Sequence, residues 1–184
     1  MTYVDEGLYN YNFDVPFPAG VYMVSSYCYV GGLNATSASV ADNFESGTTS
    51  GGTGWSGAWT LSGAQISSSS SYDGSYSMLI ADDDDPDRDI TSSDTYSSVD
   101  VSFWWRATSI EGGEYGYFYL DDASGNPFLL ETITDGDDDG VWHHSTTTLS
   151  ATTDSFDFDG TLTFRGTTSN NWKQGIIFIL IQLI

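Results

Sequence analysis

Two predicted strands in the middle of the chain carry side chains that suit sugar binding. The segments VDVSFWWRATS (99–109) and YGYFYLDD (115–122) alternate apolar and polar residues, which is typical of strands with one buried face. The alternation turns four aromatic or cationic side chains outward: Trp104, Arg106, Tyr117 and Tyr119. Aromatic rings backed by one guanidinium suit the C–H faces of sugars. The pattern predicts a glycan-binding strip on one sheet; the alternative is that residues 1–40 or a neighbouring subunit cover it.

Cation binding is a second candidate chemistry, because the chain is rich in clustered carboxylates. The turn DGDDDG (135–140) places Asp135, Asp137 and Asp139 between glycines, and carboxylate oxygens are ligands that Ca²⁺ prefers. The turn therefore predicts a structural calcium site. The acidic run DDDDPDRDI (82–90) lacks the glycine of an EF-hand loop, so we expect a solvated loop with Arg88 as its local counter-charge.

No residue pattern in the sequence predicts a catalytic site. There is no Gly-x-Ser-x-Gly elbow, no glycine-rich phosphate loop and no metal-spaced set of His and Cys. Glu111 and Glu114 flank two glycines, which is typical of a solvated turn rather than of a glycosidase pair. His143 and His144 are adjacent on a predicted strand and point to opposite faces, so they cannot share one metal ion. The sequence therefore predicts that the protein is not an enzyme.

The composition predicts the fold class and excludes nucleic acid as a partner. No segment shows a sustained 3.6-residue apolar period, and 20 glycines punctuate the 184 residues, so we expect an all-β protein. Asp and Glu number 26 against four Lys and Arg, and the formal charge of −22 repels nucleic acid. Such a surface resembles that of proteins of extreme halophiles and suits molar salt, where the screening length falls to about 3 Å. A calcium-loaded extracellular domain is a compatible interpretation.

The order of elements between residues 42 and 80 resembles that of one group of folds. An acidic–aromatic start, a loop of Gly, Ser and Thr with two tryptophans, and an alternating strand follow one another: Phe44-Glu45, Trp55 and Trp59, and SYSMLIA. This order resembles the first third of β-jelly-roll domains of the carbohydrate-binding-module, MAM and laminin-G-like kind. The resemblance implies a two-sheet jelly-roll sandwich over residues 41–184.

The same resemblance implies roles for two further residues. In this group of folds an acidic pair on the last strand helps to hold a structural calcium ion, and the resemblance makes Glu45 another ligand. Gly175-Ile176-Ile177 stands in place of that acidic pair here. The segment GVWHH resembles a strand of laminin-G-like and lectin-like sandwiches whose tryptophan is a core residue, which implies that Trp142 is buried.

Residues 1–40 are predicted to form an extended N-terminal arm and strand that makes assembly contacts. They hold six of the twelve tyrosines, and tyrosine-rich surfaces are typical of interfaces. The last segment, 176–184, is apolar on both faces except at Gln182, which predicts a central strand covered on both sides. The sandwich core covers one side, and we expect the arm of the same or a neighbouring subunit to cover the other. The predicted assembly residues are Phe13, Phe17, Tyr22, Tyr27, Ile177 and Ile179.

These features favour a structural virion protein of a virus with a halophilic host. The N-terminus has no signal-peptide pattern and no apolar run is long enough for a membrane helix, so synthesis in the host cytoplasm and residence in the virion are expected. The expected roles are head decoration, turret or tail-associated jelly roll. The expected partners are further copies of the chain, other virion proteins and host surface glycans. The alternative function is a stand-alone carbohydrate-binding, lectin-like module.

Overall fold

The computed structural model of the chain describes residues 2–4, 8–10, 37–72, 74–81, 83–169 and 173–184, with the backbone alone at 2–4, 8–10, 173–178 and 180. The chain divides into two compact units, Met1–Ala35 and Thr36–Ile184. In the first unit, strand β1 (Thr2–Val4) pairs antiparallel with strand β2 (Leu8–Asn10). Four of the predicted assembly residues, Phe13, Phe17, Tyr22 and Tyr27, lie outside the described residues, and so does most of the predicted arm and strand at 1–40.

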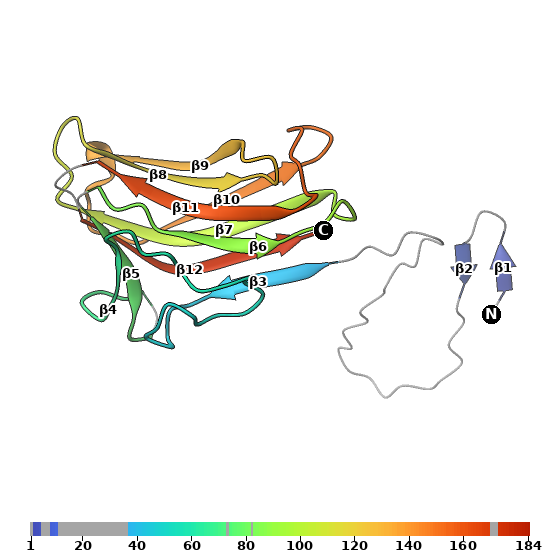
Figure 1. Cartoon of the computed structure of the whole chain (residues 1–184), viewed down its shortest axis with the longest axis horizontal. Helices are drawn as coiled ribbons and strands as arrows, with labels where there is room; N and C mark the ends of the chain where they lie inside the picture. Colours follow the sequence, from blue (N-terminus) through green and yellow to red (C-terminus); the bar gives the residue numbers. More distant parts are fainter. Residues whose placement is uncertain (1, 5–7, 11–36, 73, 82, 170–172) are drawn as a thin grey trace, which may run out of the picture. The chain divides into compact units, whose positions relative to one another are not determined.

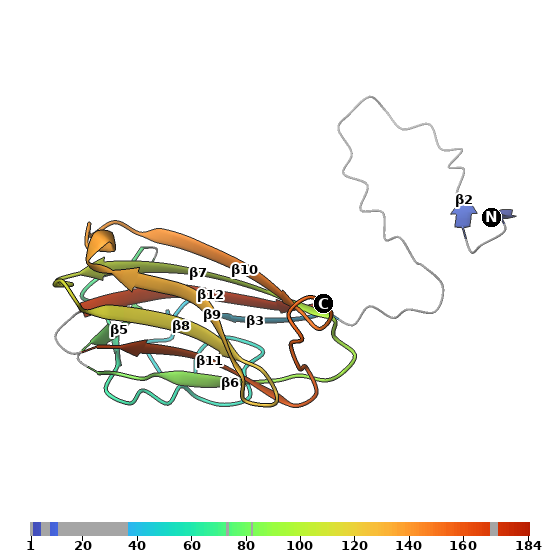
Figure 2. The same ribbon diagram turned by 90° about the horizontal axis from the view of Figure 1, so that it is seen from above.

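The second unit is a sandwich of two antiparallel sheets (Figures 1 and 2). The six-stranded sheet has the order β10-β7-β12-β5-β4, with β3 also paired to β12, and the four-stranded sheet has the order β6-β11-β8-β9. The first sheet consists of β3 (Ala38–Asp42), β4 (Gln65–Ser67), β5 (Ser77–Ala81), β7 (Ser98–Thr108), β10 (His143–Ser150) and β12 (Lys173–Leu183). The second sheet consists of β6 (Asp87–Thr91), β8 (Tyr115–Asp121), β9 (Pro127–Thr134) and β11 (Thr161–Thr168).

The predicted all-β, two-sheet sandwich is confirmed. The single helical element of the described residues is a short 3₁₀ turn, η1 (Asp135–Asp137), directly after β9. No helix among the described residues is long and apolar enough to cross a bilayer. Strand β3 begins at Ala38, so the sandwich starts slightly before residue 41, where the sequence placed its boundary.

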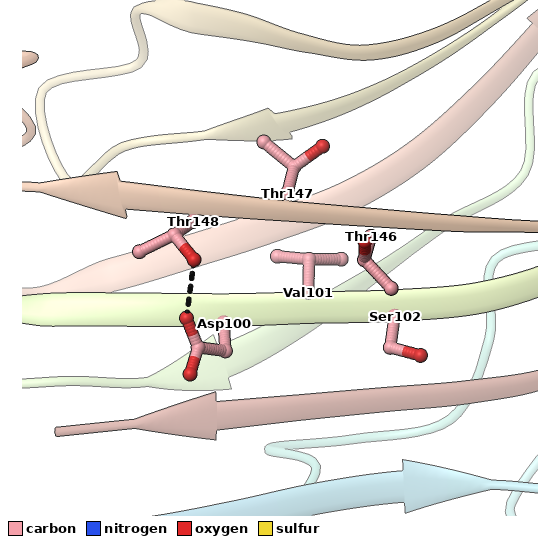
Figure 3. A pocket seen from close by; sticks show the side chains of 6 residues that line it. All are labelled: Asp100, Val101, Ser102, Thr146, Thr147 and Thr148. Atoms are coloured by element: carbon pink, nitrogen blue, oxygen red, sulfur yellow. Dashed lines mark hydrogen bonds between the residues drawn. The ribbon is translucent and has the colours of Figure 1, made fainter.

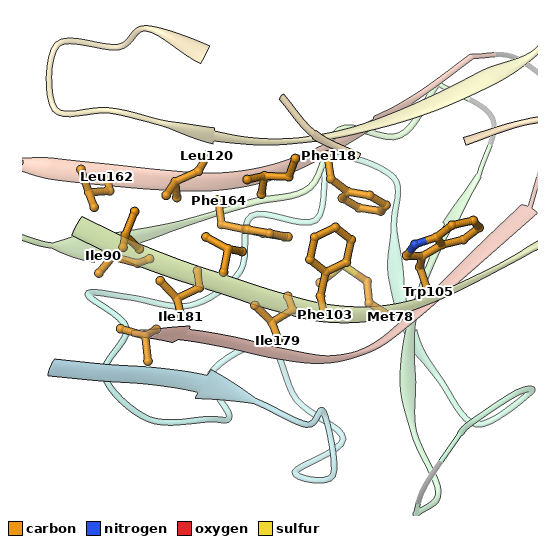
Figure 4. Packing of buried hydrophobic residues seen from close by; sticks show 14 of the residues in the cluster. Met78, Ile90, Phe103, Trp105, Phe118, Leu120, Leu162, Phe164, Ile179 and Ile181 are labelled. Carbon is orange, nitrogen blue, oxygen red and sulfur yellow. The ribbon is translucent and has the colours of Figure 1, made fainter. Parts of the chain in front are cut away.

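The core forms because the inward positions of each strand are apolar. Along β7, every second side chain is buried and its neighbours are not, which is the alternation that the sequence predicts. Phe103 of β7 packs against Phe118 and Phe164 of the other sheet, with ring centroids 5.1 and 5.8 Å away, as Figure 4 shows. Each fully buried phenylalanine contributes roughly 1.5–3 kcal/mol. These rings hold the two sheets together.

Strand β12 is central, as predicted, because it pairs with β7 along one edge and with β5 and then β3 along the other. Ile179 and Ile181 are fully buried between the two sheets (Figure 4). The prediction that Ile179 makes an assembly contact is therefore wrong, because the sandwich core itself covers that face. The side chain of Ile177, the other predicted contact on this strand, lies outside the described residues.

A buried ion pair joins the two sheets beside the core. Nη1 of Arg88, on β6, lies 2.6 Å from Oδ2 of Asp42, on β3, and the two side chains are 4% and 1% exposed. Asp42 also accepts hydrogen bonds from Trp59 Nε1 (3.0 Å) and from the backbone N–H of Phe44 (2.8 Å). Burial lowers the pKa of the Arg88 guanidinium, and Asp42 opposes that shift. The prediction of Arg88 in a solvated acidic loop is therefore wrong: its partner is a carboxylate 46 residues earlier.

Candidate functional site

The four residues of the predicted glycan-binding strip point outward, but they do not share a surface. Trp104 and Arg106 lie on β7 of the six-stranded sheet, whereas Tyr117 and Tyr119 lie on β8 of the four-stranded sheet. The outer faces of the two sheets are on opposite sides of the sandwich. The prediction of a single strip is therefore wrong, and each half of it has its own neighbours.

Trp104 belongs to a stack of three rings on the outer face of the six-stranded sheet. Its indole stacks on Tyr72, with centroids 4.4 Å apart and planes 19° apart, and on His144, at 4.6 Å and 20°. His144 reaches this position because it lies directly opposite Trp104 in the β7–β10 register. Tyr72 arrives from the serine-rich loop before β5 and is 53% exposed. The stack therefore presents an aromatic surface to solvent.

Two further side chains border this stack. The ring of Trp142 meets Tyr72 edge-on at a centroid distance of 6.1 Å. The implied core position of Trp142 is therefore wrong, since this half-buried residue packs on the outer stack instead. Arg106, two positions after Trp104, donates from Nη1 to Ser70 Oγ at 2.9 Å, and its Nε has no hydrogen-bond partner. We call the surface formed by Tyr72, Trp104, Arg106, Trp142 and His144 the aromatic face.

A hollow lies on β7 and β10, the two strands that carry Trp104 and His144, and Figure 3 shows the side chains that line it. Its walls include Asp100 and Ser102 of β7 and Thr146 and Thr148 of β10. Thr148 Oγ1 donates to Asp100 Oδ1 at 2.6 Å. In the β7–β10 register this pair is followed by Ser102 opposite Thr146 and then by Trp104 opposite His144. Ser102 Oγ and His144 Nε2 lie 2.8 Å apart, which links the hollow to the ring stack. Hydroxyl and carboxylate groups therefore lie in line with stacked rings.

Glu45 fixes the loop that carries Tyr72. Its Oε1 accepts hydrogen bonds from the backbone N–H groups of Ser75 and Tyr76, both at 2.8 Å, and its Oε2 accepts from Ser75 at 3.0 Å. Gly74, with φ of +74°, lies so close that an added Cβ would be 2.4 Å from the Glu45 carboxyl carbon. A residue other than glycine would therefore displace the carboxylate. Glu45 acts in this structure as an anchor of the Tyr72 loop.

We expect replacement of Glu45 by Ala to loosen the Tyr72 loop. The Ser75 and Tyr76 amides would lose a charged acceptor, so their hydrogen exchange should become roughly tenfold faster. Mass spectrometry of exchanged peptides measures this change. The matched control is Asp138→Ala, because Asp138 holds the backbone N–H groups of Ser109 and Ile110 in the same way at a different loop. Unchanged exchange at Ser75 and Tyr76 in the Glu45 variant would contradict the anchoring role.

The predicted cation ligands at 135–139 serve the turn itself. Asp137 Oδ2 accepts hydrogen bonds from the backbone N–H and the hydroxyl of Thr134, which caps η1. Asp139 Oδ1 accepts from the Val141 N–H at 2.8 Å and contacts His143 Nε2 at 3.1 Å, and these two partners lower the pKa of Asp139. Asp135 is exposed. The described residues form no group of three or more His, Cys, Asp or Glu that fits a metal ion. Calcium binding stays a prediction.

The other half of the predicted strip belongs to a row of three tyrosines on β8. Tyr115, Tyr117 and Tyr119 point outward at alternate positions, with successive centroids 4.9 and 6.0 Å apart. Arg165 of β11 lies over the Tyr119 ring at 4.4 Å and pairs through Nε with Asp121 at 2.8 Å. We call Tyr115, Tyr117 and Tyr119 the tyrosine ladder.

Comparison with known proteins relates the fold, and not the sequence, to other proteins. No protein-family model matches the chain, and no curated protein sequence matches it. Among solved structures, the chain is similar to the CBM22-1 xylan-binding domain of Paenibacillus barcinonensis Xyn10C, with a TM-score of 0.54, 15% identity, and coverage of 78% of this chain and 92% of that one.

Two other solved structures are similar to a comparable degree. TmCBM61, solved in complex with beta-1,4-galactotriose, has a TM-score of 0.51 at 16% identity and covers 75% of this chain and 92% of its own. The CBM22-1–GH10 modules of Clostridium thermocellum xylanase 10B, complexed with xylohexaose, have a TM-score of 0.54 at 12% identity, covering 77% of this chain and 28% of that one. The chain therefore has the β-jelly-roll fold of carbohydrate-binding modules, which confirms the predicted fold class.

Sequence reasoning missed three members of the aromatic face: Tyr72, Trp142 and His144. Tyr72 lies in a loop, where no periodicity indicates which way a side chain points. His144 had a detectable signal, since a strand that pairs with β7 in register places it opposite Trp104. That pairing joins segments about 40 residues apart and is a property of the folded chain.

Proposed function

We propose that this chain is a non-catalytic carbohydrate-binding module that binds glycans on the aromatic face. The observation that carries the proposal is the stack of Tyr72, Trp104 and His144 on the outer side of the six-stranded sheet. Stacked rings that reach solvent favour ligands with apolar C–H faces, and sugar rings have such faces. The carbohydrate-binding-module fold is consistent with this use, although a shared fold alone does not assign it.

The groups around the ring stack can form hydrogen bonds with the hydroxyl groups of a sugar. Arg106 lies on the same face as Trp104, and its Nη1 donates to Ser70 Oγ in the loop before Tyr72, so a guanidinium lies beside the rings. Asp100, Ser102 and Thr146 offer acceptors and hydroxyls in the adjoining hollow. A site built to pair with hydroxyl groups rejects ligands that lack them, because its own polar groups then lose their partners. We infer an oligosaccharide ligand that spans the hollow and the stack.

The net charge narrows the class of glycan. A chain with a charge of −22 repels polyanions such as uronic-acid polymers at low ionic strength. Neutral oligosaccharides meet no such repulsion. Two neighbours in the fold comparison were solved with neutral oligosaccharides, xylohexaose and beta-1,4-galactotriose, and these are suitable first probes.

Replacement of Trp104 by Ala should weaken glycan binding at the aromatic face at least roughly tenfold, because the variant loses the centre of the ring stack. An array of neutral oligosaccharides that includes xylohexaose and beta-1,4-galactotriose identifies the ligand, and isothermal titration calorimetry measures the affinity. Trp104→Phe keeps a ring at this position and should retain most of the binding. Thermal unfolding of both variants shows whether the fold persists. A folded Trp104→Ala variant with the affinity and the number of binding sites of wild type would contradict the proposal.

The virion role predicted from the sequence stays a prediction beside this proposal. It rests on the acidic composition and on the tyrosine-rich residues 1–40, and its expected partners are further copies of the chain and other virion proteins. A glycan-binding module is compatible with a virion surface, where it would contact host sugars, and equally with a stand-alone lectin-like protein. The proposed ligand site is the same in both settings.

A further inference from the structure

We propose that the outer face of the four-stranded sheet is a second glycan-binding site, so that one chain binds two oligosaccharides on opposite sides of the sandwich. This inference deepens the proposed function and rests on it for the class of ligand. The site is centred on the tyrosine ladder, Tyr115, Tyr117 and Tyr119, with Arg165 beside it.

The ladder presents rings in a row because of the strand period. Side chains at alternate positions of β8 share its outer face, and the intervening Phe118 and Leu120 are buried in the core. Tyr115 is 44% exposed, and Tyr117 and Tyr119 are half-buried, so the rings rest on the sheet and keep part of their surface open. A linear run of rings on a flat sheet suits an extended chain of sugars.

Polar side chains flank the ladder on both neighbouring strands. The register places Thr167 opposite Tyr117 and Arg165 opposite Tyr119 on β11, and it places Thr132 of β9 on the other side of Tyr117. Arg165 keeps a fixed orientation because its guanidinium lies over the Tyr119 ring and its Nε donates to Asp121. Hydroxyls and guanidinium donors are groups that suit a ligand with many hydroxyl groups. The face thus repeats the chemistry of the aromatic face: rings, one guanidinium and hydroxyls.

The charge of the chain favours a glycan over a second copy of this chain as the ligand of the tyrosine ladder. Two copies with a charge of −22 each repel one another at low ionic strength. At one end of the ladder Arg165 pairs with Asp121, and the register places two further carboxylates on the same outer face, Asp87 opposite Arg165 and Asp89 opposite Thr163. A second acidic chain or an anionic glycan would meet these charges, whereas a neutral glycan would not. One large aliphatic side chain among those described on this face is strongly exposed, Leu129 at 52%, whereas the core of a protein interface is largely apolar. These features favour a neutral, hydroxylated ligand.

The decisive experiment counts binding sites on the full chain. Calorimetry with the strongest-binding neutral oligosaccharide from the array, at six sugar units or fewer, should give two sites per chain, because a short oligosaccharide cannot reach both outer faces. The double variant Tyr117→Ala/Tyr119→Ala should retain one site, and Trp104→Ala should also retain one. Tyr117→Phe/Tyr119→Phe keeps both rings and is the matched control, expected to keep both sites. Tyr115→Ala, at the most exposed ring, should weaken the second site at little cost to folding.

The outcomes distinguish failure of the second site from failure of the proposed function. If wild type has one site that the ladder variants leave intact, the second site is refuted and the proposed function stands. If the ladder variants lose all binding while Trp104→Ala loses none, the aromatic face is refuted and the ladder is the site. If the ladder variants change only the molecular mass in light scattering, the face is a protein interface and the inference is wrong. Wild type that binds no oligosaccharide on the array would overturn both.

Discussion

Replacement of Asp42 by Ala should lower the free energy of unfolding by about 3–5 kcal/mol, which is a large part of the stability of a domain of this size. The variant leaves the Arg88 guanidinium buried without its carboxylate partner, and it also removes the acceptor for Trp59 Nε1 and for the Phe44 N–H. An uncompensated buried charge costs more than the pair itself contributes. Urea unfolding followed by tryptophan fluorescence measures the change, with Trp55 and Trp59 close to the site.

A second ion pair in the same protein provides the control. Arg165 Nε and Asp121 Oδ2 lie 2.8 Å apart, close to the 2.6 Å of the first pair, but their side chains are 26% and 20% exposed. Asp121→Ala should therefore cost less than about 1 kcal/mol, as is typical of pairs that water reaches. The double variant Asp42→Leu/Arg88→Met should be less destabilised than Asp42→Ala alone, because it leaves no buried charge. Equal costs for Asp42→Ala and Asp121→Ala would show that the buried pair has no special role.

The thermal midpoint should rise by roughly 10 °C between 0.1 and 3 M KCl. The cause is the formal charge of −22 on 184 residues, whose self-repulsion is screened as the Debye length falls from about 10 Å at 0.1 M to about 3 Å at 1 M. A gain of a few kcal/mol corresponds to a shift of this size for a domain of 150–250 residues. Differential scanning calorimetry in a series of salt concentrations measures it. Equal midpoints at 0.1 and 3 M salt would refute the halophilic interpretation of the composition.

The same scans separate screening from calcium binding. The gain in KCl should persist with a chelator present, because screening needs no specific ion. If millimolar CaCl₂ at low salt gave the full gain and chelator removed it, the calcium prediction at Glu45, Asp135, Asp137 and Asp139 would be supported instead. Glu45→Ala would then abolish the calcium response if Glu45 were a ligand.

The fold class and the direction of most strand side chains could be predicted from the sequence, because both depend on local patterns. The alternation in 99–109 and 115–122 is a two-residue period, and it correctly turned Trp104 and Tyr117 outward and Phe103 inward. The apolar run at the C-terminus likewise indicated a central strand, and β12 is central. In each case the information lies within about ten residues.

Only the tertiary structure decided which of these side chains meet. β8 pairs with β11, some 45 residues later, rather than with β7, and this pairing places Tyr117 and Trp104 on opposite sides of the sandwich. His144 stacks on Trp104, and Arg88 pairs with Asp42, through contacts between segments about 40 residues apart. An alternating pattern predicts that a side chain faces outward. It does not predict which sheet the strand belongs to, because sheet membership depends on long-range pairing. The predicted sugar strip is therefore divided between two faces, because its two strands belong to different sheets.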